Sequence, residues 1–313
     1  MNGGPKQLQG KTAAWQISVA VGSRARLLGD SMLRSKFLRL LGLLALLYAG
    51  LSLVVAMLQD KLIYFPHRAD EAALIERGRT EGLEPWRDGS GAIVGWKAPR
   101  LGSTPPAANR LVVFHGNLGY AQHRLGYVEG FGQIAGGRTW EVYLFEYPGY
   151  GAREGKLGEA SFIAAGLAAL RTLREADARP IYLLGESLGS GLASALAGRE
   201  PQSVAGVMLI TPFASLTEVA AHHYPFLPVR LILRDHWDNA AALRSYAGPL
   251  AVRLAGQDEV IPVTHGRRLY EAYAGRKQLW IGEGASHNSL DFSMSSSWWE
   301  EVTRFLLAAP EPR

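Results

Sequence analysis

One serine of this 313-residue chain stands in a context suited to nucleophilic catalysis. The motif GESLG at residues 185–189 follows the apolar run Ile181–Leu184 and precedes a helical stretch of small residues. A G-x-S-x-G motif between a strand and a helix predicts a sharp, strained turn that exposes the serine hydroxyl. The helix N-terminus behind it favours developing negative charge. We therefore expect Ser187 to be the nucleophile.

An acid and a base follow in the order that such a serine requires. Asp258 lies after the strand-like run Leu250–Leu254, and His287 follows the next apolar run. A serine hydroxyl is a poor nucleophile until a base removes its proton and an acid orients that base. We expect His287 to be the base and Asp258 the acid, with Glu259 as the alternative carboxylate.

Two backbone amides could stabilise the oxyanion of such a reaction. One belongs to Leu188, the residue after the serine, and the other to the loop that follows the strand ending at Phe114. In that loop the sequence His-Gly-Asn lets the backbone turn toward a substrate, and we assign the second donor to Asn117. His115 is interpreted as structural.

Short apolar runs alternate with helical stretches around these motifs, which predicts a mostly parallel sheet with helices on both faces. The expected strands are Arg110–Phe114, Glu141–Phe145, Ile181–Leu184, Val204–Ile210, Leu250–Leu254 and Gln278–Ile281. The expected helices are Ala160–Ala176, Leu188–Ala197, His265–Tyr273 and Trp298–Leu307.

The alternation is interrupted at about 211–248, which we interpret as a short lid-like insertion near the site. Its apolar side chains predict an acyl pocket, unless they simply pack on the core; the candidates are Phe213, Tyr224, Phe226 and Leu227. His222, His223 and His236 lack carboxylates at ligand spacing, so we expect no metal.

The N-terminal region predicts a membrane anchor. Residues 40–58 form 19 residues without a charge, long enough for a hydrocarbon core of about 30 Å. Basic residues precede this run, and the positive-inside rule then places the N-terminus in the cytoplasm and the large domain on the extracytoplasmic side, which is the periplasm in a bacterium. A cleaved signal peptide and a buried core helix are the alternatives.

These features divide the chain into three parts. We expect a basic, partly disordered cytoplasmic segment at 1–36, a transmembrane signal anchor at 37–59, and a catalytic domain at 60–313. A second basic flank starts at Met32, so residues 1–31 are either an extension or sequence upstream of the true start.

Composition narrows the function further. The net charge of +5 is concentrated before the apolar run, no nucleic-acid motif accompanies it, and nucleic acid is therefore not an expected partner. The absence of cysteine excludes disulfides and thiolate chemistry. No P-loop or dinucleotide fingerprint is present, and we expect no cofactor.

Together the motifs resemble the α/β-hydrolase superfamily over about residues 61–307, and more closely its membrane-anchored α/β-hydrolase domain-containing subgroup. The segments that carry the resemblance are KLIYFP, FHGN, EYPGYG, GESLG, TPFASL, HYPFLP, GQDEVIP and GASHN. Glu146 stands where the EYPGYG turn more usually has Asp.

The resemblance implies an α/β-hydrolase fold and hydrolysis of an ester or thioester, with small-molecule or lipid acyl esters as substrates. A serine peptidase acting on short peptides and a non-catalytic binding protein are the alternatives. The substrate and the oligomeric state are left open.

Overall fold

The computed structural model of the protein describes residues 10–98, 107–137 and 139–309. The chain divides into two compact units, Met1–Val55 and Ala56–Arg313. Helix α1 (Gly10–Ile63) runs through the first unit and ends in the second.

Part of α1 is long and apolar enough to cross a membrane. The segment Arg34–Ile63 has 30 residues and a mean hydropathy of 2.4 over its most apolar window, only 6% of which is buried. At 1.5 Å per residue the segment is about 45 Å long, more than a hydrocarbon core requires. The expected apolar helix is therefore present.

The second unit contains a sheet of eight strands in the order β10-β9-β8-β7-β4-β6-β3-β2. Six neighbouring strands of this sheet are parallel, namely β10, β9, β8, β7, β4 and β6. Strands β3 and β2 are antiparallel to their neighbours. Their bounds are β2 (Glu84–Arg87), β3 (Ile93–Lys97), β4 (Asn109–Phe114), β6 (Trp140–Phe145), β7 (Ile181–Glu186), β8 (Val204–Ile210), β9 (Leu250–Ala255) and β10 (Lys277–Gly282).

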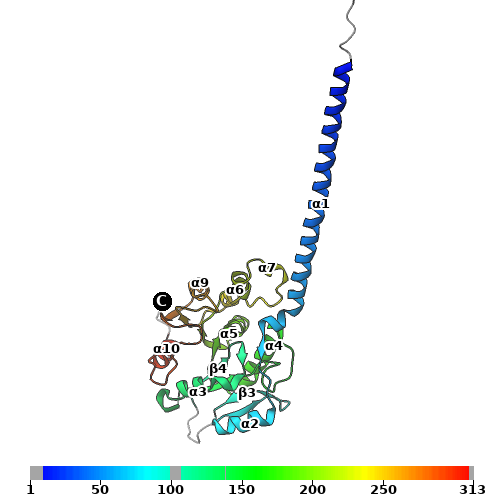
Figure 1. Ribbon diagram of the computed structural model, residues 1–313. Coiled ribbons are helices and arrows are strands. Elements are labelled where there is room, and N and C mark those ends of the chain that lie inside the picture. Colours follow the sequence, from blue (N-terminus) through cyan, green and yellow to red (C-terminus); the bar gives the residue numbers. More distant parts are fainter. Residues whose placement is uncertain (1–9, 99–106, 138, 310–313) are drawn as a thin grey trace, which may run out of the picture. The chain divides into compact units, whose positions relative to one another are not determined.

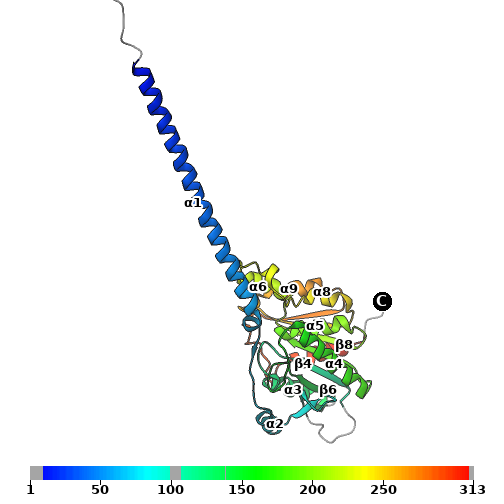
Figure 2. The same cartoon turned by 90° about the vertical axis from the view of Figure 1, so that its right-hand side faces the viewer.

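Helices cover both faces of this sheet, as predicted from the alternating runs. Along β4, Val112 and Phe114 join one buried cluster with residues of α4 (Glu159–Ala176) and α5 (Leu188–Arg199). Leu111 and Val113 join the opposite cluster with residues of α3 (Leu125–Gly132) and α10 (Trp298–Leu307). Figures 1 and 2 show α5 and α3 on opposite sides of β4.

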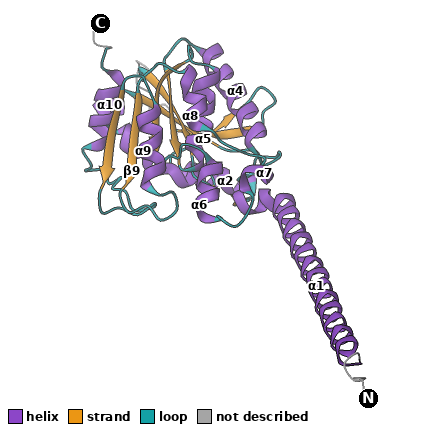
Figure 3. Cartoon of the chain, turned by 90° about the horizontal axis from the view of Figure 1, so that it is seen from above, coloured by secondary structure: helices purple, strands orange, loops and turns teal. Residues whose placement is uncertain are grey.

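The remaining elements are short. Helices α2 (Glu71–Thr80) and α9 (Val263–Ala272) complete the two layers, and Figure 3 shows α9 beside β9. Strands β1 (Phe65–Pro66) and β5 (Leu118–Gly119) form a separate parallel pair. Single-turn helices lie at Ala121–Arg124, Ile134–Gly137 and Leu243–Ser245. The interruption at 211–248 contains α6 (Leu216–His223), α7 (Val229–Ile232) and α8 (Asn239–Ala242).

Candidate active site

Ser187 occupies a strained turn between β7 and α5. Its backbone has φ of 51° and ψ of −113°, a conformation that non-glycine residues rarely adopt. The two glycines around it are sterically required. A Cβ on Gly185 would lie 2.3 Å from the carbonyl oxygen of Gly189, and one on Gly189 would lie 2.1 Å from that of Phe114. The sequence GESLG thus makes the turn that lifts the Ser187 hydroxyl beyond the sheet.

The loops after β9 and β10 bring Asp258 and His287 to this hydroxyl. His287 Nε2 lies 3.1 Å from Ser187 Oγ, and His287 Nδ1 lies 2.7 Å from Asp258 Oδ2. Because an ionised carboxylate only accepts hydrogen bonds, Nδ1 carries the proton and Nε2 is left to accept one. The arrangement can therefore take a proton from Ser187.

Asp258 is held in place by its own loop. Its Oδ1 accepts hydrogen bonds from the backbone N–H of Val260 at 3.0 Å and Ile261 at 2.7 Å, and its side chain is only 2% exposed. Glu259, the alternative acid, accepts at 3.4 Å from the backbone N–H of His287. The carboxylate that contacts the imidazole ring is therefore that of Asp258.

The two expected oxyanion donors lie in the elements that flank Ser187. Leu188 is the first residue of α5, and the first-turn amides of a helix have no carbonyl acceptor within it. A Cβ built on Gly116 would be 3.7 Å from Ser187 Cβ, so the loop carrying Asn117 runs beside the serine. The Asn117 side chain accepts hydrogen bonds from Phe65 N–H and the Tyr150 hydroxyl, which fixes this loop.

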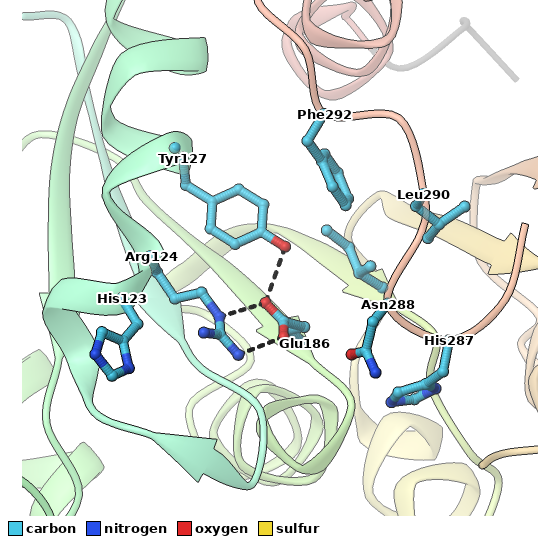
Figure 4. Close-up of a pocket in the computed structure, with 10 residues that line it drawn as sticks. His123, Arg124, Tyr127, Glu186, His287, Asn288, Leu290 and Phe292 are labelled. Carbon is cyan, nitrogen blue, oxygen red and sulfur yellow. Dashed lines mark hydrogen bonds and ion pairs between the residues drawn. The ribbon is translucent and has the colours of Figure 1, made fainter. Parts of the chain in front are cut away.

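A cavity of about 290 Å³ opens beside His287 (Figure 4). One wall is apolar and the other carries polar side chains. Its lining comprises His123, Arg124, Gly126, Tyr127, Glu186, Ile210, His287, Asn288, Leu290 and Phe292. An uncharged group bound beside His287 would have both apolar and hydrogen-bonding neighbours here.

The polar wall is organised by an ion pair that the sequence reasoning missed. Arg124 Nε and Nη2 donate to the two carboxylate oxygens of Glu186 at 2.7 and 2.6 Å, and the Tyr127 hydroxyl donates to Glu186 at 3.1 Å (Figure 4). The sequence offered one indication of this pair. Glu186 is the variable residue before the nucleophile, and a charged side chain at a partly buried position needs a partner. Arg124 lies 62 residues from Glu186, so only the fold reveals that partner.

The cavity wall has little net charge at neutral pH. Burial lowers the pKa of the Arg124 guanidinium, but Glu186 outweighs this effect and the pKa is raised. Burial, followed by Glu186, raises the pKa of Tyr127 well above its usual range. Burial, followed by the charges of Arg77 and Arg124, lowers the pKa of His123. The cation and the carboxylate therefore compensate each other, and the tyrosine and His123 are neutral.

The four candidate acyl-pocket residues are not gathered around this cavity. Phe213 is 1% exposed and belongs to the buried cluster that contains residues of α4 and α5. Tyr224 and Phe226 are largely exposed, and Leu227 is half-buried. The residues that line the cavity come from the turn at Ala121–Arg124, from α3, from the ends of β7 and β8, and from the loop at 287–292. The acyl pocket expected from the sequence stays a prediction, and the cavity beside His287 is a separate site.

His115, which we interpreted as structural, lies in the interior. His115 is 1% exposed, and its Nε2 lies 3.3 Å from the Glu146 carboxylate, the residue that replaces the more usual Asp. Within the described ranges, no group of three or more His, Cys, Asp or Glu side chains is arranged to hold a metal ion.

Comparison with known proteins assigns the family. A family model for the alpha/beta hydrolase fold matches residues 109–237. The uncharacterized protein Rv2307c of Mycobacterium tuberculosis (strain ATCC 25618 / H37Rv) is 31% identical over 283 residues, covering 88% of this chain and 97% of that protein. The alpha/beta hydrolase domain-containing protein WAV2 of Arabidopsis thaliana is 28% identical over 223 residues, covering 65% of this chain and 71% of that protein. The chain belongs to the α/β-hydrolase family.

A solved structure shares the architecture. The Pyrococcus furiosus esterase Pf2001 superposes with a TM-score of 0.57 over 78% of this chain and 97% of that one, at 16% sequence identity. At this identity the similarity shows the fold, and it confirms the α/β-hydrolase fold predicted from the motifs.

Proposed function

We propose that the protein is a membrane-anchored serine hydrolase that cleaves carboxylic ester or thioester bonds through an acyl-enzyme. The observation that carries this proposal is the position of His287, whose ring lies 3.1 Å from Ser187 Oγ on one side and 2.7 Å from Asp258 on the other. That geometry is what proton transfer from a serine nucleophile requires.

The reaction follows from these contacts. Ser187 Oγ attacks the acyl carbon while His287 Nε2 takes its proton, and Asp258 stabilises the resulting imidazolium. The amides of Leu188 and Asn117 donate hydrogen bonds to the oxyanion. His287 then protonates the leaving alcohol or thiol, and water hydrolyses the acyl-Ser187 ester by the same steps in reverse. Every group used belongs to the chain, so no cofactor is invoked.

The cavity favours an uncharged acyl ester as substrate. Ile210, Leu290 and Phe292 supply apolar contacts, and the Arg124–Glu186 pair leaves the polar wall without a large net charge. The structurally similar Pyrococcus furiosus protein is described as an esterase, which supports the same class of reaction.

The membrane part of the proposal depends on α1. The uncharged run at 40–58 follows the cations Arg34, Lys36 and Arg39, which favours a cytoplasmic N-terminus and an extracytoplasmic catalytic domain. Alkaline carbonate should leave the full-length protein in the membrane fraction, and protease added outside spheroplasts should digest the catalytic domain. Release by carbonate contradicts anchoring, and protection from protease contradicts the orientation.

The activity is tested by turnover of the full-length protein in detergent. We expect hydrolysis of p-nitrophenyl esters and thioesters, and at least about tenfold slower cleavage of aminoacyl amides, whose leaving groups are poorer. Faster cleavage of the amides would favour a peptidase. Turnover of neither class, by a protein that does not react with a fluorophosphonate, would indicate a binding protein.

A further inference from the structure

The connection between α6 and α7 exposes large apolar side chains. Tyr224 is 60% exposed, Phe226 87% and Leu231 86%. Val229, between them, is buried and attaches the segment to the core. Single exposed apolar residues are ordinary, but several on one short segment indicate a surface that contacts something else. None of the three lines the cavity beside His287, so acyl binding there does not explain their exposure.

This segment is hydrogen-bonded to the last turns of α1. The Gln59 side chain is 4% exposed; its amide donates to the Ile232 carbonyl at 3.2 Å, and its oxygen accepts from the Arg234 backbone N–H at 2.7 Å. Arg234 Nη2 also pairs with Asp60 at 2.7 Å. All these residues lie within the compact unit that begins at Ala56.

A third contact completes the attachment. The Tyr64 hydroxyl donates to Asp235 Oδ2 at 2.6 Å and accepts from Trp237 Nε1 at 3.1 Å. Residues 232–237 are therefore fixed to residues 59–64, immediately after the uncharged run that ends at Leu58.

In an anchored protein, the attachment of this segment to residues 59–64 determines how close it lies to the membrane. If residues 40–58 occupy the hydrocarbon core, Gln59 and Asp60 lie where the headgroups begin. A segment bonded to those two residues lies at the same depth. Its side chains suit that depth, because aromatic and aliphatic residues enter the interface while exposed cations such as Arg230 and Arg234 meet anionic headgroups.

A second set of apolar residues extends toward the serine. Leu62, Phe65 and Leu118 are 56%, 50% and 62% exposed, and β1 pairs Phe65 with Leu118. The Asn117 side chain donates to the Ile63 carbonyl and accepts from Phe65 N–H. The end of α1 is thus attached directly to the loop that carries the expected oxyanion donor.

We propose that these side chains form an interfacial surface that enters the headgroup region of the bilayer and brings the catalytic edge to membrane-dissolved acyl esters. The interfacial surface comprises Tyr224, Phe226, Leu231, Leu62, Phe65 and Leu118. The inference rests on the proposed anchoring of α1 and goes further, because an anchored domain could equally stand clear of the lipid.

The test uses the full-length protein, whose lack of cysteine allows single labelling sites. Phe226→Cys and Leu231→Cys are labelled with an environment-sensitive fluorophore and reconstituted into phosphatidylcholine–phosphatidylglycerol vesicles. Lipids carrying a nitroxide on the upper acyl chain should quench both labels about twofold or more, because quenching requires near contact with the lipid.

Two further labelling sites distinguish contact of the interfacial surface with lipid from insertion of α1 alone. Leu47→Cys lies near the middle of the uncharged run and should be quenched by a nitroxide on the lower acyl chain whenever α1 is inserted. Glu175→Cys lies at the exposed end of α4, at the sheet edge opposite Ser187, and should not be quenched. An unquenched Leu47 label contradicts the anchor.

The remaining outcomes concern the interfacial surface alone. A quenched Leu47 label with unquenched labels at 226 and 231 overturns the interfacial surface and leaves the anchor intact. Labels at 226 and 231 that report an apolar environment without lipid quenching would indicate a protein partner, such as a second copy of the chain, and would also overturn it.

Discussion

The sheet edge around Ser187 and the α6–α8 segment lie in the same domain but are constrained in different ways. At the edge, the strained Ser187 turn, two glycines without room for a Cβ, and the loop bonds of Asp258 each admit few residue types. In the α6–α8 segment, Phe226 and Leu231 are more than four-fifths exposed. At the sheet edge, contacts with other parts of the same chain restrict which residue types fit.

This difference explains why one region could be interpreted from sequence and the other could not. A turn that admits only certain residues produces a recognisable sequence motif such as GESLG. An aromatic residue gives no such motif, because the sequence around it can be the same whether it packs on a core, lines a pocket or contacts lipid. We expect activity to depend on the constrained edge rather than on the exposed segment.

The largest effect is expected for His287→Ala. Without the base, Ser187 cannot lose its proton, and kcat for a p-nitrophenyl ester should fall by about 10⁶-fold, as for other catalytic triads. His222→Ala, on α6, is the matched control and should retain activity within about twofold, since its ring is exposed. Comparable losses in both variants would contradict the assignment of the base.

Asp258→Asn should lower kcat by about 10⁴-fold while the protein stays folded, because an amide in place of the carboxylate selects the wrong imidazole tautomer. Glu259→Gln changes the neighbouring carboxylate in the same way and should cost less than about tenfold, since Glu259 accepts its hydrogen bond from the backbone of His287 and not from the imidazole ring. A larger loss for Glu259→Gln than for Asp258→Asn would show that the wrong carboxylate was chosen.

Gly189→Ala tests the steric constraint through stability. The new methyl would meet the Phe114 carbonyl oxygen, and we expect the free energy of unfolding to fall by about 3 kcal/mol. Gly132→Ala, at the end of α3 with no atom within 4 Å of the new Cβ, should change it by less than about 1 kcal/mol. Thermal unfolding of the two variants measures the difference, and equal melting temperatures would argue against a tight elbow.

The smallest effects concern the acyl chain. Phe292→Ala removes part of the apolar cavity wall and should lower the ratio of octanoate to acetate kcat/KM by about threefold to tenfold in detergent. Phe226→Ala should change that ratio by less than about twofold, because Phe226 does not line the cavity. The reverse ranking would favour an acyl pocket at the α6–α7 connection, as the sequence predicts.

Much of the sheet was predictable because five of its six parallel strands, β4 and β6 to β9, are almost wholly buried and appear as apolar runs. The antiparallel strands β2 and β3 were not predicted. The sequence EPWR of β2 is short, charged and half-exposed, and it contains proline. Helix α3 contains three glycines, which oppose helix formation. Its structure depends on tertiary packing, since a Cβ on Gly130 would lie 2.4 Å from the Trp299 ring.

The candidate site was predictable to the extent that its members follow strands in a required order. Asp258 and His287 could be selected among the acids and histidines because each follows a strand of the same parallel sheet, β9 for Asp258 and β10 for His287. The Arg124–Glu186 pair could not be predicted, because no sequence motif indicates which residue pairs with either of them. The cavity depends on such long-range pairs, and therefore substrate preference is harder to predict than reaction class.

Covalent labelling shows whether Ser187 is an activated nucleophile. The full-length protein is treated with a fluorophosphonate probe, with Ser203→Ala as the control because Ser203 is hydrogen-bonded to Glu200 at the far end of α5. We expect stoichiometric labelling of the wild type and of Ser203→Ala, with the adduct on the peptide containing Ser187, and no labelling of Ser187→Ala. Labelling of folded Ser187→Ala at the wild-type level would show that Ser187 is not the nucleophile.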